Sequence, residues 1–351
     1  MLGKIQFIIF LLTLVIPFGG ILAYFFSEKE LTNKENRSKT EFPSGEFSIS
    51  AFPGEKLDSF ISDHFWFRMK LIELNNTLNA RVWRTVSHPD VIWGKSGWLF
   101  YSAQNAFDTF TGKEYLTDEQ IKQFCDWLVH LESESRRLGK KFCFVLVPNK
   151  MTIYPEYLPT DKYKLKANKT EVNTVMEELR ALLKEETLVD LRKVFQEEKS
   201  ESEIFYYRKD THWSGAGTVL AYRTILEQIG LEKSLAREQF LPTRVLYSGD
   251  LSRLLGLFSE EEEGVLYKIP ENFLESNHKK KQNLVIYGDS FLDNLNPYLK
   301  LHFNIEQSVH VDTLVKSGNL KNLIYSEETD ILIIQIVERK LINFIKSLKG
   351  S

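Results

Sequence analysis

The chain has 351 residues, a formal net charge of −3 and 43% hydrophobic residues, which is enough apolar sequence for one large domain or two small ones. The small net charge gives no basis for nucleic-acid binding, and two cysteines, Cys125 and Cys143, are too few for a zinc cage. Both are expected to be buried thiols, and a disulfide between them is allowed but not required.

The N-terminal segment is strongly apolar. Residues 5–26 are broken only by Gln6, Thr13, Pro17 and a glycine pair, and about 20 such residues suffice to cross a bilayer. Lys4 on the N-terminal flank predicts that this end stays in the cytoplasm. No convincing cleavage site follows, which favours an uncleaved anchor over a signal peptide.

The rest of the chain is then expected outside the cytoplasm. The predicted organisation is a transmembrane anchor at residues 1–28, a polar linker at residues 29–55 with several prolines and glycines, and a catalytic domain at residues 56–351.

The first elements of that domain follow from spacing and turn residues. Helical spacing over residues 56–84 predicts one or two helices that pack on the main sheet. Residues 91–101 predict a hairpin that turns at residues 95–97. Residues 117–138 predict an amphipathic helix that ends at Gly139.

Strands and helices then alternate. Residues 142–147 are predicted to be a continuous apolar strand, and residues 204–207 a further strand that leads into a polar segment at Asp210. The charge runs at residues 259–263 and 278–281 are expected to be solvated loops. Further strands are predicted at residues 188–191, 284–287, 309–311 and 331–337, and helices at residues 172–183, 215–229 and 339–348.

This order predicts an α/β fold, a parallel sheet with helices on both faces. In such sheets the active site lies beyond the carboxyl ends of the strands.

One strand end carries a candidate nucleophile. Gly288, Asp289 and Ser290 follow the buried strand at residues 284–287. A serine between a strand and a helix lies where backbone N–H groups favour an oxyanion. Asp289 is expected to brace this turn. The tripeptide alone is equally compatible with an ordinary turn.

A second segment supplies the base that a serine hydroxyl needs. Asp210 and His212 are two residues apart, and in an extended segment the carboxylate would orient the imidazole. Trp213 could flank the ring. The rival pair downstream, His310 and Asp312, falls in a short apolar strand pattern and is interpreted as structural.

Other polar groups are predicted at the same edge of the sheet. Asn149 and Lys150 follow the strand at residues 142–147. Asn149 could donate to an oxyanion or a sugar hydroxyl, and Lys150 could attract an acidic polymer; binding to loop backbone groups is an equal alternative for both. Gly249 could place a backbone donor in the cleft from a loop between helical segments.

Gly288-Asp289-Ser290 with the upstream Asp210-Thr211-His212-Trp213 resembles the AlgX/AlgJ-type, SGNH-hydrolase-like family of polysaccharide O-acetyltransferases and the related DHHW proteins. Residues 94–101, 147–155, 248–251 and 337–339 add to the resemblance, which covers about residues 60–345. As in that family, the Asp-x-His pair precedes the serine. Thr211 stands where the DHHW name implies a histidine, and the C-terminal carbohydrate-binding module of some members is not expected here.

The resemblance implies an SGNH-hydrolase-like fold and an O-acetyltransferase outside the cytoplasm. An acetyl group would pass to Ser290 and then to a hydroxyl of a cell-surface polysaccharide, with no metal or nucleotide cofactor. The implied donor is a membrane-bound acyltransferase of the MBOAT type, because acetyl-coenzyme A is not found outside the cell. The alternatives are an acetylesterase with the same triad and a non-catalytic polysaccharide-binding or assembly protein.

Overall fold

The computed structural model describes residues 19, 40–43, 54–65, 68–79, 88–200, 203–231, 236–258, 261–271, 281–317 and 328–348. The chain forms two compact units, residues 1–87 with 252–260, and residues 88–251 with 261–351. Helices α3 (Gly54–His64) and α4 (Arg68–Leu78) belong to the first unit. Their predicted packing on the main sheet stays a prediction.

No helix within the described residues is both long and apolar enough to cross a membrane. The predicted anchor, residues 5–26, lies outside the described residues apart from Gly19. The anchor therefore stays a prediction, as does most of the linker at residues 29–55.

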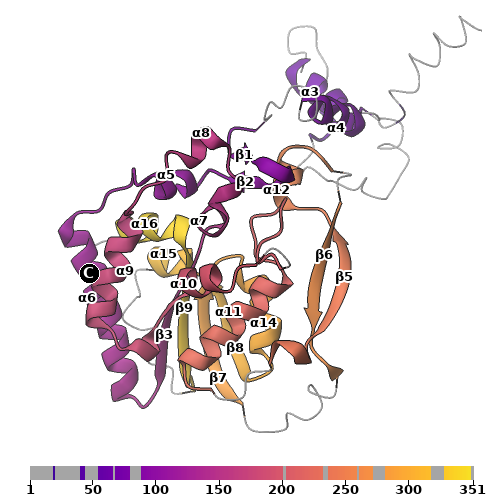
Figure 1. The fold of residues 1–351 in the computed structure, drawn as a ribbon. Coiled ribbons are helices and arrows are strands. Elements are labelled where there is room, and N and C mark those ends of the chain that lie inside the picture. The colour runs from indigo at the N-terminus through magenta and orange to yellow at the C-terminus, as the bar shows by residue number, and fades with distance from the viewer. Residues whose placement is uncertain are drawn as a thin grey trace, which may run out of the picture. The chain divides into compact units, whose positions relative to one another are not determined.

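The second unit is built on the predicted parallel sheet, which has five strands in the order β4-β3-β9-β7-β8 (Figure 1). The strand at residues 309–311 is longer than predicted. The centre of the sheet is β9, which is buried at every residue. The strands are β3 (Lys141–Val147), β4 (Leu188–Asp190), β7 (Gln282–Gly288), β8 (Phe303–His310) and β9 (Ile331–Val337).

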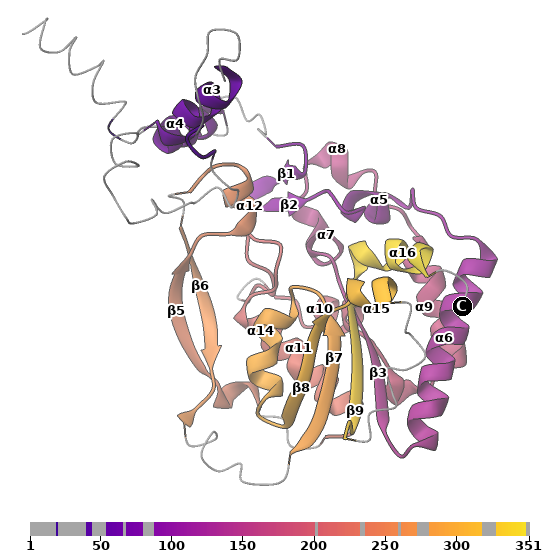
Figure 2. The same cartoon turned by 180° about the vertical axis from the view of Figure 1, so that it is seen from behind.

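Both faces of the sheet are covered by helices, as the alternating pattern predicts (Figure 2). Side chains from α10 (Leu191–Glu197), α11 (Gly215–Gln228) and α14 (Leu292–Leu299) contribute to the core on one face. Those of α6 (Asp118–Arg137), α9 (Glu171–Leu182) and α16 (Glu338–Ser347) contribute to the core on the other. Successive residues of β3 point alternately to the two cores because side chains alternate along a strand.

The helix predicted at residues 117–138 is present as α6, and its capping residues explain where it begins and ends. Thr117 and Gln120 form a reciprocal capping box at the start of α6. At the other end Gly139 has a φ of 69°, a conformation that glycine adopts without steric cost. The capped ends and the apolar stripe therefore define the same helix.

A two-stranded ribbon was missed. β5 (Leu241–Tyr247) pairs antiparallel with β6 (Glu262–Lys268), so the charge run at residues 259–263 is not simply a solvated loop. Glu262 and Glu263 pair with Tyr247 and Leu246. Most residues of the ribbon are exposed, and the two glutamates at the start of β6 belong to a charge run that is typical of a solvated loop.

Two shorter segments also differ from prediction. Residues 204–207 add no strand to the sheet, and within this segment Tyr206 makes only an isolated bridge to Trp213. Gly249 lies between β5 and helix α12 (Asp250–Leu254), not between two helical segments. The predicted hairpin is present as β1 (Val91–Trp93) and β2 (Leu99–Tyr101).

The remaining short helices connect these elements. They are η4 (Lys95–Gly97), α5 (Ala106–Thr111), α7 (Lys150–Ile153), η5 (Pro155–Tyr157), α8 (Thr160–Tyr163), η6 (Glu185–Thr187), η7 (Arg237–Gln239) and α15 (Asp312–Ser317).

Candidate active site

Ser290 lies in the turn that joins β7 to α14, and its side chain is exposed. A β-carbon at Gly288 would lie 2.5 Å from the side-chain oxygen of Gln335 and 2.6 Å from Leu292, so any other residue at this exit from the strand would displace these two side chains. The backbone N–H of Ser290 donates to no acceptor in the described part of the chain. It is therefore available to a ligand.

The neighbouring Asp289 is buried and braces the turn, as its place beside the serine suggested. Its carboxylate accepts hydrogen bonds from the N–H groups of Phe291 (3.1 Å) and Val337 (2.8 Å) and from the amide of Gln335 (3.0 Å). These bonds tie the turn to the end of the central strand β9, which fixes the position of Ser290.

The structure brings the three predicted residues together. His212 Nε2 lies 2.7 Å from Ser290 Oγ, and His212 Nδ1 lies 2.7 Å from Asp210 Oδ1. His310, the rival base, instead lies 3.3 Å from Asp312. Of these two histidines, His212 is the one whose ring is hydrogen-bonded to the serine.

The local geometry of this pair differs from the predicted extended segment. Residues 208–212 form turns and bends, and Asp210 Oδ1 also accepts the backbone N–H of His212 at 2.9 Å. An aspartate that binds the backbone two residues on is a common turn device. The same oxygen thus fixes both the backbone and the ring of His212.

A second carboxylate, Asp250, completes the surroundings of this histidine. Its Oδ2 lies 3.5 Å from His212 Nδ1, and its N–H donates to Asp210 Oδ2 at 2.9 Å. Its carboxylate accepts the N–H of Thr211 at 2.8 Å and the Thr211 hydroxyl. The sequence patterns do not reveal this role, although residues 248–251 contribute to the family resemblance.

These contacts shift the pKa values of the site. Burial lowers the pKa of His212, but the hydrogen bond to Asp210 and the charges of Asp210 and Asp250 outweigh burial and raise it. Burial raises the pKa of Asp210, but its bonds to His212 and to the N–H of Asp250 bring it down to about 2. Burial and the charge of Asp210 raise the pKa of Asp250. Asp210 is therefore the ionised partner that favours an imidazolium.

Lys150 lies beneath the loop rather than in the cleft, so it is not placed to attract a polymer. Its ammonium group is buried and donates to the carbonyl oxygens of Tyr207 (3.0 Å), Arg208 (2.9 Å) and Asp210 (2.8 Å). Burial lowers the pKa of Lys150 to about 7, against the opposing charges of Asp210 and nearby acids. The lysine holds the loop that carries Asp210 and His212.

Asn149 is also buried, with 3% of its surface exposed. Its backbone N–H donates to Glu338 at 2.9 Å, and its side-chain oxygen and nitrogen have no hydrogen-bond partner within the described structure. The amide therefore keeps unused hydrogen-bonding capacity next to Lys150.

The two remaining site candidates, Trp213 and Gly249, stabilise the fold around the site. Trp213 is completely buried against Phe291 and Phe195, so it does not flank the histidine ring in the cleft. A β-carbon at Gly249 would lie 2.0 Å from the Lys209 carbonyl oxygen, so this glycine allows the close approach of two backbones. The nearby N–H donors bind Asp210 and the Lys209 carbonyl rather than an oxyanion.

Phe291 occupies the place that Trp213 was expected to take. Its ring lies 5.1 Å from the ring of His212. The buried guanidinium group of Arg339 lies 5.6 Å from the same aromatic ring. Its positive charge partly offsets the rise in the pKa of His212. Sequence reasoning assigned neither residue to the site. Phe291 follows the nucleophile directly, but its contact with His212 depends on tertiary packing, and Arg339 arrives from the end of β9.

Among the described residues, Asp210, His212 and Asp250 form a cluster with metal-ligand atoms, all within 4.8 Å of one another. Each carboxylate in this set already accepts hydrogen bonds from within the loop and α12. The donor set thus fits mutual hydrogen bonding without an added cation.

Comparison with known proteins gives a family match and structural neighbours. A family model described as "SGNH hydrolase-like domain, acetyltransferase AlgX" matches residues 91–299, and no curated protein matches the chain. PatB1 of Bacillus cereus is 14% identical with a TM-score of 0.51, over 70% of this chain and 95% of that chain. At this identity the likeness shows a shared fold only.

Two further solved structures are similar. The O-acetyltransferase domain of Pseudomonas putida AlgJ is 17% identical with a TM-score of 0.49, over 75% of this chain and 94% of that chain. Pseudomonas aeruginosa AlgX is 15% identical with a TM-score of 0.44, over 73% and 65% of the two chains. The family match at residues 91–299 covers more than half of the chain and includes Asp210, His212 and Ser290, and the chain therefore belongs to the AlgX family of SGNH hydrolase-like acetyltransferase domains.

Proposed function

We propose that the protein is a polysaccharide O-acetyltransferase that carries the acetyl group as an ester on Ser290. The observation that carries the proposal is the continuous hydrogen-bond chain from Ser290 Oγ through His212 to Asp210, with both links at 2.7 Å. This is the arrangement that activates a serine hydroxyl as a nucleophile.

In the first half-reaction, Ser290 Oγ attacks the acetyl carbonyl carbon of the donor while His212 Nε2 takes the hydroxyl proton. The tetrahedral intermediate collapses, the bond to the donor oxygen breaks, and His212 returns the proton to that leaving oxygen. Asp210 holds the proton on Nδ1 and stabilises the transient imidazolium.

In the second half-reaction, His212 takes the proton of a sugar hydroxyl, whose oxygen attacks the acetyl ester. Ser290 leaves and regains its proton from His212, and the product is an acetylated sugar. Water in place of the sugar would give an esterase, so the outcome depends on how well the acceptor excludes water.

The developing negative charge needs hydrogen-bond donors. The N–H of Ser290, which has no acceptor among the described residues, is the first of these. The unpartnered amide of Asn149 is the proposed second donor, to the oxyanion or to a sugar hydroxyl. An Asn149→Asp variant, which loses that donor, should lower the turnover number more than it raises KM; the reverse split would assign the residue to acceptor binding.

The proposed location is outside the cytoplasm, with residues 1–28 as the anchor and a membrane-bound acyltransferase of the MBOAT type as the acetyl donor. The apolar run at residues 5–26 supports this placement. Protease treatment of intact cells that carry the full-length chain is the test, and a chain that is digested only after lysis would contradict it.

The proposed activity is tested with the full-length chain in detergent. Wild type, Ser290→Ala and a control, Ser133→Ala on the exposed face of α6, are incubated with p-nitrophenyl acetate, with and without glycan oligomers. Mass spectrometry then looks for an acetyl adduct on the enzyme and for acetylated glycan.

We expect a Ser290-dependent adduct that transfers to glycan in wild type and in the control. Release only to water, whatever glycan is offered, would make the protein an esterase. An adduct that persists in Ser290→Ala, or no adduct in wild type, would reject the proposed nucleophile.

A further inference from the structure

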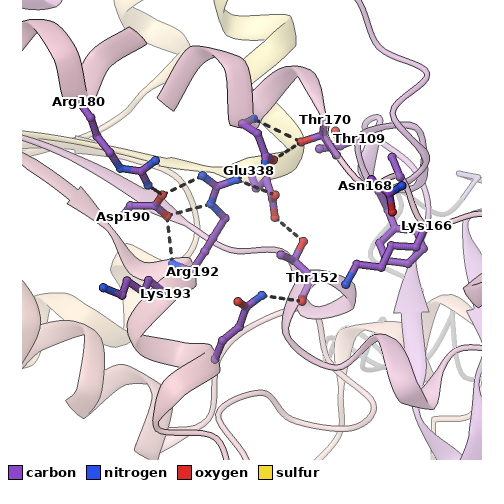
Figure 3. A pocket seen from close by; sticks show the side chains of 14 residues that line it. Thr109, Thr152, Lys166, Asn168, Thr170, Arg180, Asp190, Arg192, Lys193 and Glu338 are labelled. Carbon is purple, nitrogen blue, oxygen red and sulfur yellow. Dashed lines mark hydrogen bonds and ion pairs between the residues drawn. The ribbon is translucent and has the colours of Figure 1, made fainter. Parts of the chain in front are cut away.

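A polar cavity of about 330 Å³ (Figure 3) lies at the carboxyl end of the sheet. Ser290, in the turn after β7, lies at the same edge. Three neighbouring strand ends contribute to its lining. Asp190 is the last residue of β4, Glu338 follows β9 directly, and Thr152 lies on α7, which follows β3. The volume is at the lower end of the range for small-molecule sites, about 300–1,000 Å³.

The two carboxylates of this cavity are already paired within the protein. Asp190 accepts hydrogen bonds from Arg192 at 2.9 and 2.8 Å and is also bonded to Arg180 (Figure 3). Glu338 accepts the hydroxyl of Thr152 and lies 3.6 Å from Arg192. Neither carboxylate is therefore left to bind a cation.

The cationic side chains outnumber these carboxylates by four to two. Besides the two arginines, the lining includes Lys166 and Lys193, which lie on opposite sides in Figure 3. Lys166 has no carboxylate partner in the described part of the chain. Lys193 lies 3.8 Å from Glu197, with both side chains largely exposed, and such a pair is weak.

Most of the remaining lining residues carry neutral hydrogen-bonding groups, beside the apolar Phe110 and Ala167: Thr109, Asn168, Thr170, Asn173 and Gln196. The Thr109 hydroxyl donates to Glu114, the Thr170 hydroxyl to Asn173 and the Gln196 amide to the Thr152 carbonyl, and each of these groups keeps further hydrogen-bonding capacity. Such groups match sugar hydroxyls, and the two lysines match a negative charge. The lining contains one aromatic residue, Phe110, so stacking on a neutral sugar ring is a minor contribution.

The cavity shares its framework with the catalytic loop. Glu338, which lines the cavity, accepts the N–H of Asn149, and the next residue, Lys150, holds the Asp210 loop. Arg339, which follows Glu338, lies over the ring of Phe291 next to Ser290. Residues 149–150 and 338–339 thus support both the cavity and the catalytic site, which keeps the cavity in a fixed position relative to Ser290.

We propose that this cavity is an acceptor subsite, which binds an anionic unit of the polysaccharide at a distance from the hydroxyl that is acetylated. The inference rests on the proposed function only in that a polymer is the acceptor. A carboxylate of an acidic sugar and a phosphate of a phosphodiester-linked glycan share the required chemistry.

The test measures binding without turnover. Full-length Ser290→Ala, with and without Lys166→Gln and Lys193→Gln together, is titrated by calorimetry with tetragalacturonate, with a glycerol phosphate oligomer and with the neutral cellotetraose. Lys122→Gln, on the exposed face of α6, is the matched control.

We expect one anionic probe to bind more tightly than cellotetraose, and the double lysine variant to weaken that probe by about tenfold. The same variant should leave cellotetraose binding unchanged, and added salt should weaken only the anionic probe. Preference for one anionic probe identifies carboxylate or phosphate as the natural group. Equal binding of all probes, or no effect of the lysine changes, would reject the subsite.

The same variants in the active protein separate this inference from the proposed function. Transfer to the preferred probe is expressed per acetyl-enzyme formed, and the double lysine variant should raise KM for the acceptor. If the double lysine variant transfers acetyl groups as well as wild type does, the proposed function stands and the subsite is rejected. If wild type binds the anionic probe but forms no acetyl-enzyme, the subsite stands and the proposed function is rejected.

Discussion

At the scale of single residues, Asp250 is the group whose effect on chemistry can be isolated most cleanly. It lies 3.5 Å from His212 Nδ1 and helps to raise the pKa of that histidine. A base is active when it is neutral, so ester hydrolysis should rise with pH through a pKa above the ordinary value of 6.5.

An Asp250→Asn variant removes one negative charge but keeps an oxygen that can accept the Thr211 N–H. The pKa of His212 should fall, and the rise of kcat/KM for p-nitrophenyl acetate should move to lower pH. The control, Asp126→Asn on exposed α6, should keep the wild-type profile. An unmoved profile in Asp250→Asn would reduce the role of Asp250 to holding Thr211.

Lys150 gives a second prediction at this scale. Lys150→Met removes the donor to three carbonyl oxygens of the catalytic loop and leaves them in a buried place, at a cost of about 1–3 kcal/mol. The turnover number should fall at least about tenfold, since misplacement of the loop separates His212 from Ser290. Stopped-flow measurement of acetyl-enzyme formation checks this, with Lys122→Met as the control. Wild-type rates in Lys150→Met would show that the contacts from Asp250 and Leu251 position the loop without the lysine.

At the scale of elements, the catalytic loop depends on a close backbone contact with the start of α12. Leu251 N–H donates to the Lys209 carbonyl at 3.2 Å, and a β-carbon on Gly249 would lie 2.0 Å from that same oxygen. A side chain here must therefore displace one of the two backbones, since neither atom belongs to a flexible side chain.

Gly249→Ala should consequently lower the turnover number about a hundredfold while the far-ultraviolet circular dichroism stays that of wild type. The matched control is Gly97→Asn, at a φ of 77° with no atom within 4 Å of the added β-carbon, because asparagine tolerates this conformation. Full activity in Gly249→Ala would mean that the loop can move without loss of the triad.

At the scale of the whole second unit, the sheet separates the two cysteines. Cys143 on β3 belongs to the core on one face and Cys125 on α6 to the core on the other. Both are free and buried, and burial raises the pKa of Cys125 to about 11 and of Cys143 to about 12. The disulfide that the sequence allowed is therefore absent for a topological reason.

The two thiols should report global unfolding. A disulfide-exchange reagent at pH 8 should label neither thiol rapidly in the native protein, because the thiolate is the reactive form, and both should label across the urea transition that circular dichroism detects. A reducing agent should leave the melting temperature unchanged. Rapid native labelling of either thiol would contradict the burial of that residue.

The sequence by itself determined the main elements and the order of the chemistry. Strands such as β9 and helices such as α6 were predicted because their signals, apolar period and capping residues, lie within the element. The nucleophile turn and the Asp-x-His pair were also local patterns. The ribbon β5–β6 was missed because its charges resemble those of a loop.

Only the tertiary structure decided what surrounds the triad. Asp250 is 40 residues from Asp210, Lys150 is 60 residues from it, and Ser290 is 78 residues from His212. Trp213 was assigned to the cleft and lies in the core, while Phe291 took its place. Contacts over such separations depend on how elements pack, and no periodicity within one element encodes them. The polar cavity beside Glu338 is of the same kind, since it exists only where the ends of β3, β4 and β9 meet.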